Sequence, residues 1–140
     1  MKKLFCTLVI LMALMFTGIQ NVHAQVDIDV TWTTDCPHIC TTQEECIRYV
    51  TYTIYEVCSE NQTVVCHDST TVDCTVKPVS FFCDYDCTES HDDPCFLIRA
   101  TAVKACVGPG GTTIICSGSG SLNVPTCSEL MDGNTVIITW

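Results

Sequence analysis

Alternation between apolar and polar residues predicts the strands in the first half of the chain. The two kinds of residue alternate strictly over residues 26–33, as expected of a β-strand with one buried face. Residues 47–57 are rich in β-branched and aromatic side chains and predict a longer strand. After a turn, residues 63–66 return as the second strand of a hairpin. We expect a new turn at residues 67–69 and another strand at residues 70–76.

The second half of the chain repeats this plan. Residues 79–81 correspond to the end of the first strand, and residues 96–105 predict the long strand. A Gly-Pro-Gly-Gly turn at residues 108–111 leads into a returning strand at residues 112–116. The Ser-Gly alternation of residues 117–121 predicts a flexible tip.

Neither half has a sustained helical period, so the predicted fold class is all-β. The Thr-Gln-Glu-Glu pattern of residues 42–45 resembles a capping box and predicts one helical turn. The chain ends in a strand-like segment, residues 136–140, that is similar to residues 28–32. Three interpretations are open: short strands share the same residue types, the segment covers an edge of the second half, or it begins a third repeat. Pairing with another copy instead would join chains head to tail.

Cysteine spacing divides the chain into two similar segments. Twelve of the 13 cysteines form two sets of six, and in each set three residues lie between the first two cysteines. The sets are Cys36, Cys40, Cys46, Cys58, Cys66 and Cys74, then Cys83, Cys87, Cys95, Cys106, Cys116 and Cys127. This repetition predicts two small tandem disulfide-rich modules of β-hairpin or sandwich-like form, residues 25–75 and 76–127, followed by a terminal strand within residues 128–140. We expect disulfides to stay within each module, although six cysteines allow 15 pairings.

The first 24 residues have the features of a cleaved secretory signal. Two lysines precede an uncharged apolar stretch, and Val22-His23-Ala24 forms a small-x-small cleavage site. The alternative is an uncleaved membrane anchor, because the uncharged stretch is just long enough to span a bilayer. Cleavage would remove Cys6 and leave 12 cysteines. This density predicts a secreted or periplasmic protein held by disulfides.

The predicted mature chain is strongly acidic. Without the two leading lysines, four basic residues face 16 acidic ones, so the net charge is 4 − 16 = −12. Nucleic acids and anionic lipid surfaces are poor partners for such a chain, because both are bound through Lys and Arg. The charge suits either solubility outside the cell or an acidic binding face.

Catalytic patterns are weak. The histidines of the mature chain, His38, His67 and His91, fall in predicted loops, and there is no GxSxG motif. Cys36-Pro37-His38-Ile39-Cys40 resembles the CPHC motif of DsbA-type thiol oxidases, but three residues separate its cysteines and no βαβ pattern surrounds it. We therefore expect no enzymatic activity. Thr51-Tyr52-Thr53 places two threonines on one strand face, far short of the threonine arrays that bind ordered water.

An acidic stretch in the second half is a candidate calcium site. Its oxygen ligands would come from Asp84, Asp86, Glu89, Asp92 and Asp93, near His91. The order does not match an EF-hand loop, and a solvated acidic loop is the simpler interpretation. Calcium is the one cofactor that the sequence suggests.

The leading hypothesis is a non-enzymatic structural or binding protein outside the cytoplasm, with a protein or glycan partner. The alternative is an inhibitor of a secreted hydrolase such as a protease, presenting a disulfide-held turn at residues 59–62 or 108–111.

Overall fold

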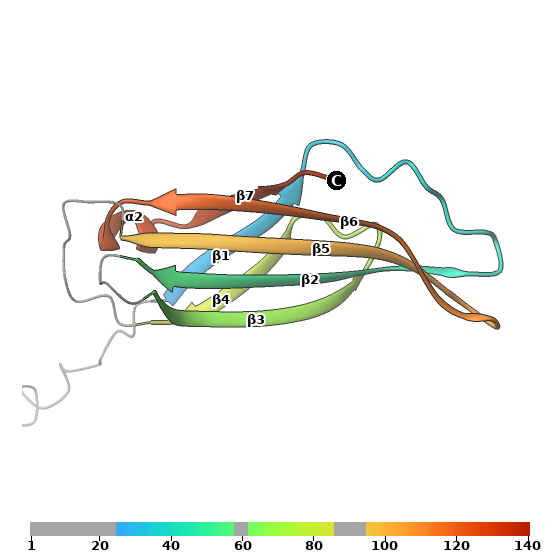
Figure 1. Ribbon diagram of the computed structural model, residues 1–140, viewed down its shortest axis with the longest axis horizontal. Helices are drawn as coiled ribbons and strands as arrows, with labels where there is room; N and C mark the ends of the chain where they lie inside the picture. The colour runs from blue at the N-terminus through green and yellow to red at the C-terminus, as the bar shows by residue number, and fades with distance from the viewer. Residues whose placement is uncertain (1–24, 58–61, 86–94) are drawn as a thin grey trace, which may run out of the picture.

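The computed structural model describes residues 25–57, 62–85 and 95–140. These segments form two β-sheets and one short helix (Figure 1). The elements are β1 (Gln25–Trp32), β2 (Glu45–Glu56), β3 (Thr63–Asp73), β4 (Val79–Asp84), β5 (Phe96–Gly108), β6 (Gly111–Val124), α2 (Cys127–Met131) and β7 (Asn134–Ile138). The all-β prediction is confirmed.

The two sheets pack face to face as a sandwich. The smaller sheet has the order β4-β1-β7, with β1 antiparallel to β4 and parallel to β7. The larger sheet has the order β3-β2-β5-β6, with every neighbouring pair antiparallel. In Figure 1, β1 and β4 cross obliquely behind the strands of the larger sheet.

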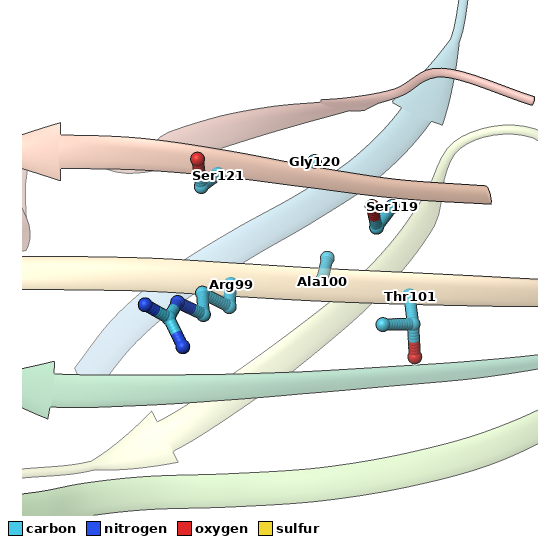
Figure 2. Close-up of a pocket in the computed structure, with 6 residues that line it drawn as sticks. All are labelled: Arg99, Ala100, Thr101, Ser119, Gly120 and Ser121. Carbon is cyan, nitrogen blue, oxygen red and sulfur yellow. The ribbon is translucent and has the colours of Figure 1, made fainter.

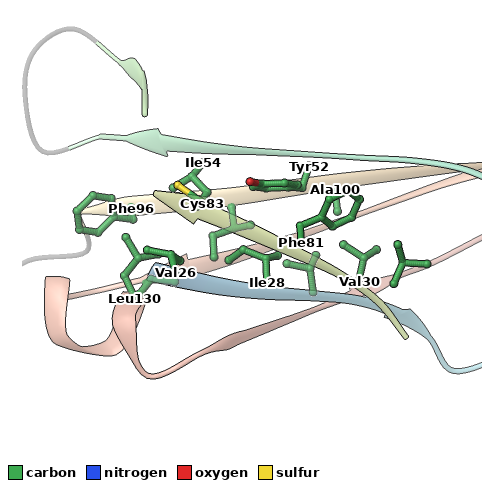
Figure 3. Close-up of a cluster of buried hydrophobic side chains, with 14 of the residues drawn as sticks. Val26, Ile28, Val30, Tyr52, Ile54, Phe81, Cys83, Phe96, Ala100 and Leu130 are labelled. Carbon is green, nitrogen blue, oxygen red and sulfur yellow. The ribbon is translucent and has the colours of Figure 1, made fainter. Parts of the chain in front are cut away.

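Inward-facing residues of both sheets form one core between them. The strict alternation of β1 places Val26, Ile28 and Val30 on the inner face, each fully buried. They meet inward residues of the larger sheet, such as Tyr52, whose ring centroid lies 4.7 Å from that of Phe81 in β4 (Figure 3). Burial of these side chains is the main apolar contribution to stability.

The sandwich does not consist of two modules. Each sheet contains strands from both residues 25–75 and residues 76–140, and the central pair of the larger sheet joins β2 of one half to β5 of the other. If each half folded by itself, the apolar faces of its strands would be exposed to solvent. In the sandwich, the strands of the two halves cover each other's apolar faces. The two halves do contain similar strands, but these strands contribute to one shared core.

The disulfides also cross between the halves, so the prediction of pairing within modules is wrong. Bonds join Cys36 to Cys116, Cys40 to Cys106 and Cys66 to Cys83, whereas Cys46–Cys74 stays within the first half. Cys95 and Cys127 are disulfide-bonded as well. Crossing follows from the topology, because the segments that carry these cysteines, including the loop after β1, are neighbours in space rather than in sequence.

Two predicted loops are strand instead. Residues 67–69 continue β3 and pair with Thr53, Tyr52 and Thr51 of β2. The Ser-Gly alternation of residues 117–121 lies within β6 and pairs with β5. In both cases the ladder of hydrogen bonds to the adjacent strand overrides the turn preference of Ser, Gly and Asp.

Glycines in β6 close one side of the sandwich. Ser119 of β6 and Thr139, just after β7, exchange two backbone hydrogen bonds of 3.1 Å. A Cβ atom at Gly118 or Gly120 would collide with the carbonyl oxygen of Thr139 or Ile137, so only glycine permits this approach. We call this contact the β6–β7 seam. The terminal strand thus pairs with β1 and closes an edge within its own chain.

Helical structure is limited and differs from the prediction. The helix α2 begins after Thr126, whose hydroxyl accepts a 3.1 Å hydrogen bond from the Glu129 N–H. No helix forms at residues 42–45; the Glu44 carboxylate instead accepts hydrogen bonds from the N–H and hydroxyl of Thr41 in a turn. Of the helices in the described segments, none is both long and apolar enough to cross a membrane.

Candidate binding face

The outer face of the larger sheet carries hydroxyl side chains in register. One row across all four strands consists of Ser69, Thr51, Thr101 and Ser119. The next row consists of His67, Thr53, Arg99 and Ser121. Since paired strands lie about 4.8 Å apart, the side chains of one row are immediate neighbours. We define the hydroxyl face as Thr51, Thr53, Ser69, Thr101, Ser119 and Ser121.

A shallow hollow lies on this face between β5 and β6. Its volume is about 300 Å³. It is lined by Arg99, Ala100, Thr101, Ser119, Gly120 and Ser121 (Figure 2). Ala100 and Gly120 are directly paired and contribute backbone, while the other four residues are exposed and contribute polar side chains. The hollow therefore offers three hydroxyls and one cation.

Arg99 is the cation at the centre of the second row. Its guanidinium carbon lies 5.4 Å from the ring centroid of Tyr55 in β2, a cation–π contact that orients the side chain across the sheet. No carboxylate among the described residues forms an ion pair with it. One strand further, the Thr53 hydroxyl and His67 Nδ1 are 2.9 Å apart and share a hydrogen bond.

Acidic residues are arranged unequally around the sandwich. In the rows that run from Tyr49 to Tyr55 of β2, no described outward-facing position is Asp or Glu. Asp68 of β3 is paired with the inward-facing Tyr52, so it does not belong to these outward rows. The outer face of the smaller sheet carries Asp27, Asp29 and Asp84 instead. A strongly acidic chain therefore presents one sheet face whose centre is neutral to basic.

In the described part of the chain, the serines of the hydroxyl face have no base beside them, and the hydroxyl that does is Thr53, which shares a hydrogen bond with His67 Nδ1. Ser119 and Ser121 lie in β6, whereas His67 lies in β3 with two strands between them. A serine needs a base within hydrogen-bond distance to act as a nucleophile. What the arrangement can do chemically is donate and accept hydrogen bonds and attract negative charge.

A second polar cluster, which we did not predict, lies under the loop that follows β1. Arg48 of β2 is 1 % exposed, and its Nη2 lies 2.7 Å from each carboxylate oxygen of Asp35. Its guanidinium carbon is 4.2 Å from the ring centroid of Trp32, and its Nη1 donates to the Cys74 carbonyl. In the alternation of β2, Arg48 occupies an inward-facing position. A cationic residue at such a position is the signal in the sequence for a buried charge that requires a partner.

Lys104 of β5 completes this cluster. Its Nζ donates to the carbonyl oxygens of Cys36 and His38, at 3.3 and 2.9 Å, and lies 3.7 Å from Asp35. Burial alone would raise the pKa of Asp35, but the hydrogen bond and charge of Arg48, the charge of Lys104 and the Cys36 N–H lower it below its usual value. The cluster ties the loop to the larger sheet and has a structural role.

The cysteines of the loop have the same role. Cys36 bonds to Cys116 and Cys40 bonds to Cys106, so the two ends of the segment that resembles a CPHC motif are each bonded to the β5–β6 hairpin and not to each other. A redox pair exchanges a bond between its own two sulfurs. The segment is a structural clamp in this fold.

The remaining predicted sites fall largely outside the described residues. Of the candidate calcium ligands, only Asp84 is described, at the end of β4; Asp86, Glu89, Asp92 and Asp93 lie in residues 86–94. No group of three or more metal-ligating side chains occurs in the described segments. Of the two turns considered for an inhibitor, residues 108–111 connect β5 to β6, and residues 59–61 of the other are not described.

Comparison with known proteins gives little. No protein-family model matches the chain, and no curated protein matches it. A solved structure of an alternative pilotin from the type II secretion system of Vibrio cholerae aligns with a TM-score of 0.43 and 12 % identity, covering 83 % of this chain and 96 % of the pilotin. At that level of similarity, nothing about function transfers from one protein to the other.

Proposed function

We propose that this protein is a non-enzymatic binding module of an oxidising compartment outside the cytoplasm, and that the hydroxyl face is its binding surface. The observation that supports this most directly is the pair of polar rows across the four strands of the larger sheet. The disulfides support the location, since such bonds persist in oxidising surroundings and are rare in the cytosol.

The rigidity of the sheet suits binding. The face is built on paired strands of 11 to 14 residues, and the β5–β6 hairpin is tied to the preceding loop by two disulfides. Side chains held on such a frame lose little conformational entropy when a ligand binds. Protein and glycan partners both remain within this proposal.

The test is a comparison of variants on the two faces of the sandwich. The probes are an array of glycans and a set of purified extracellular proteins. Thr101→Val and Ser119→Ala remove exposed hydroxyls from the hollow, while Thr135→Val removes an exposed hydroxyl from β7 on the opposite sheet. We expect the first two to weaken partner binding by about fivefold each, since one neutral hydrogen bond contributes about 1 kcal/mol, and Thr135→Val to have no effect.

Equal thermal unfolding of the three variants would show that the loss is not one of folding. If all three bind like the wild type, the surface assignment fails. If the purified protein binds nothing but turns over a substrate in a panel of hydrolase assays, the non-enzymatic proposal fails with it.

A further inference from the structure

Arg99 gives the hydroxyl face a charge preference. We infer that the ligand is a polysaccharide that carries carboxylates, with one carboxylate placed on Arg99 and the sugar hydroxyls on the hydroxyl face. This inference rests on the proposed function and adds the chemical class of the ligand. Three features of the hollow support it.

The first feature is the environment of the charge. Arg99 is exposed, and Tyr55 orients its guanidinium from one side through the 5.4 Å cation–π contact. No described carboxylate neutralises it, and the outward rows around it contain no acid. The chain has a net charge of −10, and the described residues include two exposed Lys or Arg side chains, Arg99 and Lys77. Of these two, Arg99 is the one that lines the hollow, so an anionic ligand would be attracted to the hydroxyl face at this position. A guanidinium binds carboxylates through two parallel hydrogen bonds.

The second feature is the kind of polar group that surrounds Arg99. The hollow presents the hydroxyls of Thr101, Ser119 and Ser121 and no other polar side chain besides Arg99. A hydroxyl both donates and accepts, so a surface of hydroxyls matches a ligand whose own groups do the same. Sugars present such groups on neighbouring carbons.

The third feature separates a sugar from an acidic peptide. Extended peptides are bound through unpaired backbone groups of an edge strand or through apolar pockets for their side chains. The hollow lies over two paired strands, and β6, the edge strand of this sheet, already pairs at Ser119 with Thr139 of its own chain. The side chains that line the hollow are polar and form no apolar pocket. An acidic peptide would find the charge but little else.

The experiment measures binding of the disulfide-bonded protein to three probes of about equal length. The first is an oligogalacturonate, the second is the same oligosaccharide with its carboxylates methyl-esterified, and the third is polyglutamate. Arg99→Gln removes the charge, Arg99→Lys retains it without the guanidinium fork, and Lys77→Gln removes an exposed charge elsewhere as the control.

We expect oligogalacturonate to bind at least tenfold more tightly than its ester or polyglutamate. Arg99→Gln should weaken oligogalacturonate binding by about ten- to a hundredfold, the range for a charged hydrogen-bond pair. Arg99→Lys should fall between Arg99→Gln and the wild type, and Lys77→Gln should bind like the wild type. Affinity should also fall as salt is added, since the contact is exposed.

Three results would overturn the inference, and they are separable from failure of the proposed function. Equal binding of the ester would show that the carboxylate is not recognised, and equal binding of polyglutamate would show that the sugar is not recognised. No binding of any probe would reject this ligand class, while the Thr101, Ser119 and Thr135 comparison would still decide whether the face binds another partner.

Discussion

A methyl group at position 120 should weaken the β6–β7 seam. A Cβ there would overlap the carbonyl oxygen of Ile137 and lie 3.2 Å from Val136 Cγ1. The main obstacle is backbone, which cannot rotate away as a side chain can, so β7 must move outward. The two backbone hydrogen bonds between Ser119 and Thr139 would then lengthen.

The size of the effect follows from these terms. Overpacking costs about 1–3 kcal/mol, and each weakened hydrogen bond costs about 0.5–1.5 kcal/mol. Replacing glycine also restricts the unfolded chain, which returns about 0.4–1 kcal/mol. We therefore expect Gly120→Ala to lower the free energy of unfolding by about 2–4 kcal/mol, a large part of the about 5–15 kcal/mol typical of a domain.

The assay is guanidinium unfolding without reductant, followed by circular dichroism. Gly110→Ala is the matched control, because a Cβ at that position has no atom within 4 Å and the residue lies in the hairpin turn. Its free energy of unfolding should equal that of the wild type or exceed it slightly. Hydrogen exchange of the Ser119 and Thr139 amides should accelerate in Gly120→Ala alone. If Gly120→Ala and Gly110→Ala are equally stable, the seam does not depend on close approach and the reasoning is wrong.

Two further predictions concern the loop after β1 and the disulfides. Asp35→Asn should lower the free energy of unfolding at pH 7 by about 1–2 kcal/mol, a value between those of exposed and buried pairs because the Asp35 side chain is 48 % exposed. Because the pKa of Asp35 lies below its usual 3.8 in the folded state, this stabilisation is present above about pH 4 and disappears as the pH falls further. In denaturant titrations, the wild type and Asp35→Asn should therefore differ at pH 7 and converge at low pH, and a difference that does not change with pH would contradict the assignment. Removing Cys36–Cys116 or Cys66–Cys83 by paired Cys→Ala changes should cost about 3 kcal/mol in each case, because Cys66–Cys83 joins residues 17 apart and Cys36–Cys116, with Cys40–Cys106 intact, closes a loop of about 15 residues. A clearly larger loss for Cys36–Cys116 in the same titration would count against a mainly entropic effect.

Local pattern predicted most strands, and long-range pairing explains what it missed. The alternation around Ile28 and the β-branched run around Thr53 both correspond to observed strands, β1 and β2. His67 lay in an expected turn because His-Asp-Ser has polar, turn-like composition, yet it sits in β3 opposite Thr53. An edge strand with a solvated outer face tolerates such residues, so composition alone cannot identify it.

Because the two halves have similar cysteine spacing, the sequence predicts the wrong disulfide partners. Two segments with the same cysteine spacing can fold separately or can share one core, and spacing does not distinguish the two. Cys66 of β3 reaches Cys83 of β4 only because the two sheets stack. That stacking depends on contacts between residues far apart in the chain.

The hydroxyl face was similarly hidden. Thr51 and Thr53 were visible as a pair on one strand, but Ser69, Thr101 and Ser119 join them only through the registers of three strand pairs. A shift of one residue in any register would turn that strand's hydroxyls away from the row. The sequence contains the residues of this face, and the topology determines that they are neighbours.

The composition of β6 connects the seam to the hollow. Ser and Gly are poor strand formers, and a run of them in a paired strand weakens the sheet. In β6 their alternation places Gly118 and Gly120 toward β7 and Ser119 and Ser121 toward solvent. Small residues inward let β7 close the sandwich, and small hydroxyls outward leave room for the hollow beside Arg99. Larger β-branched residues would stabilise the strand but would fill both spaces, so the sequence of β6 is explained by closure of the sandwich and, under the proposed function, by binding, rather than by strand stability.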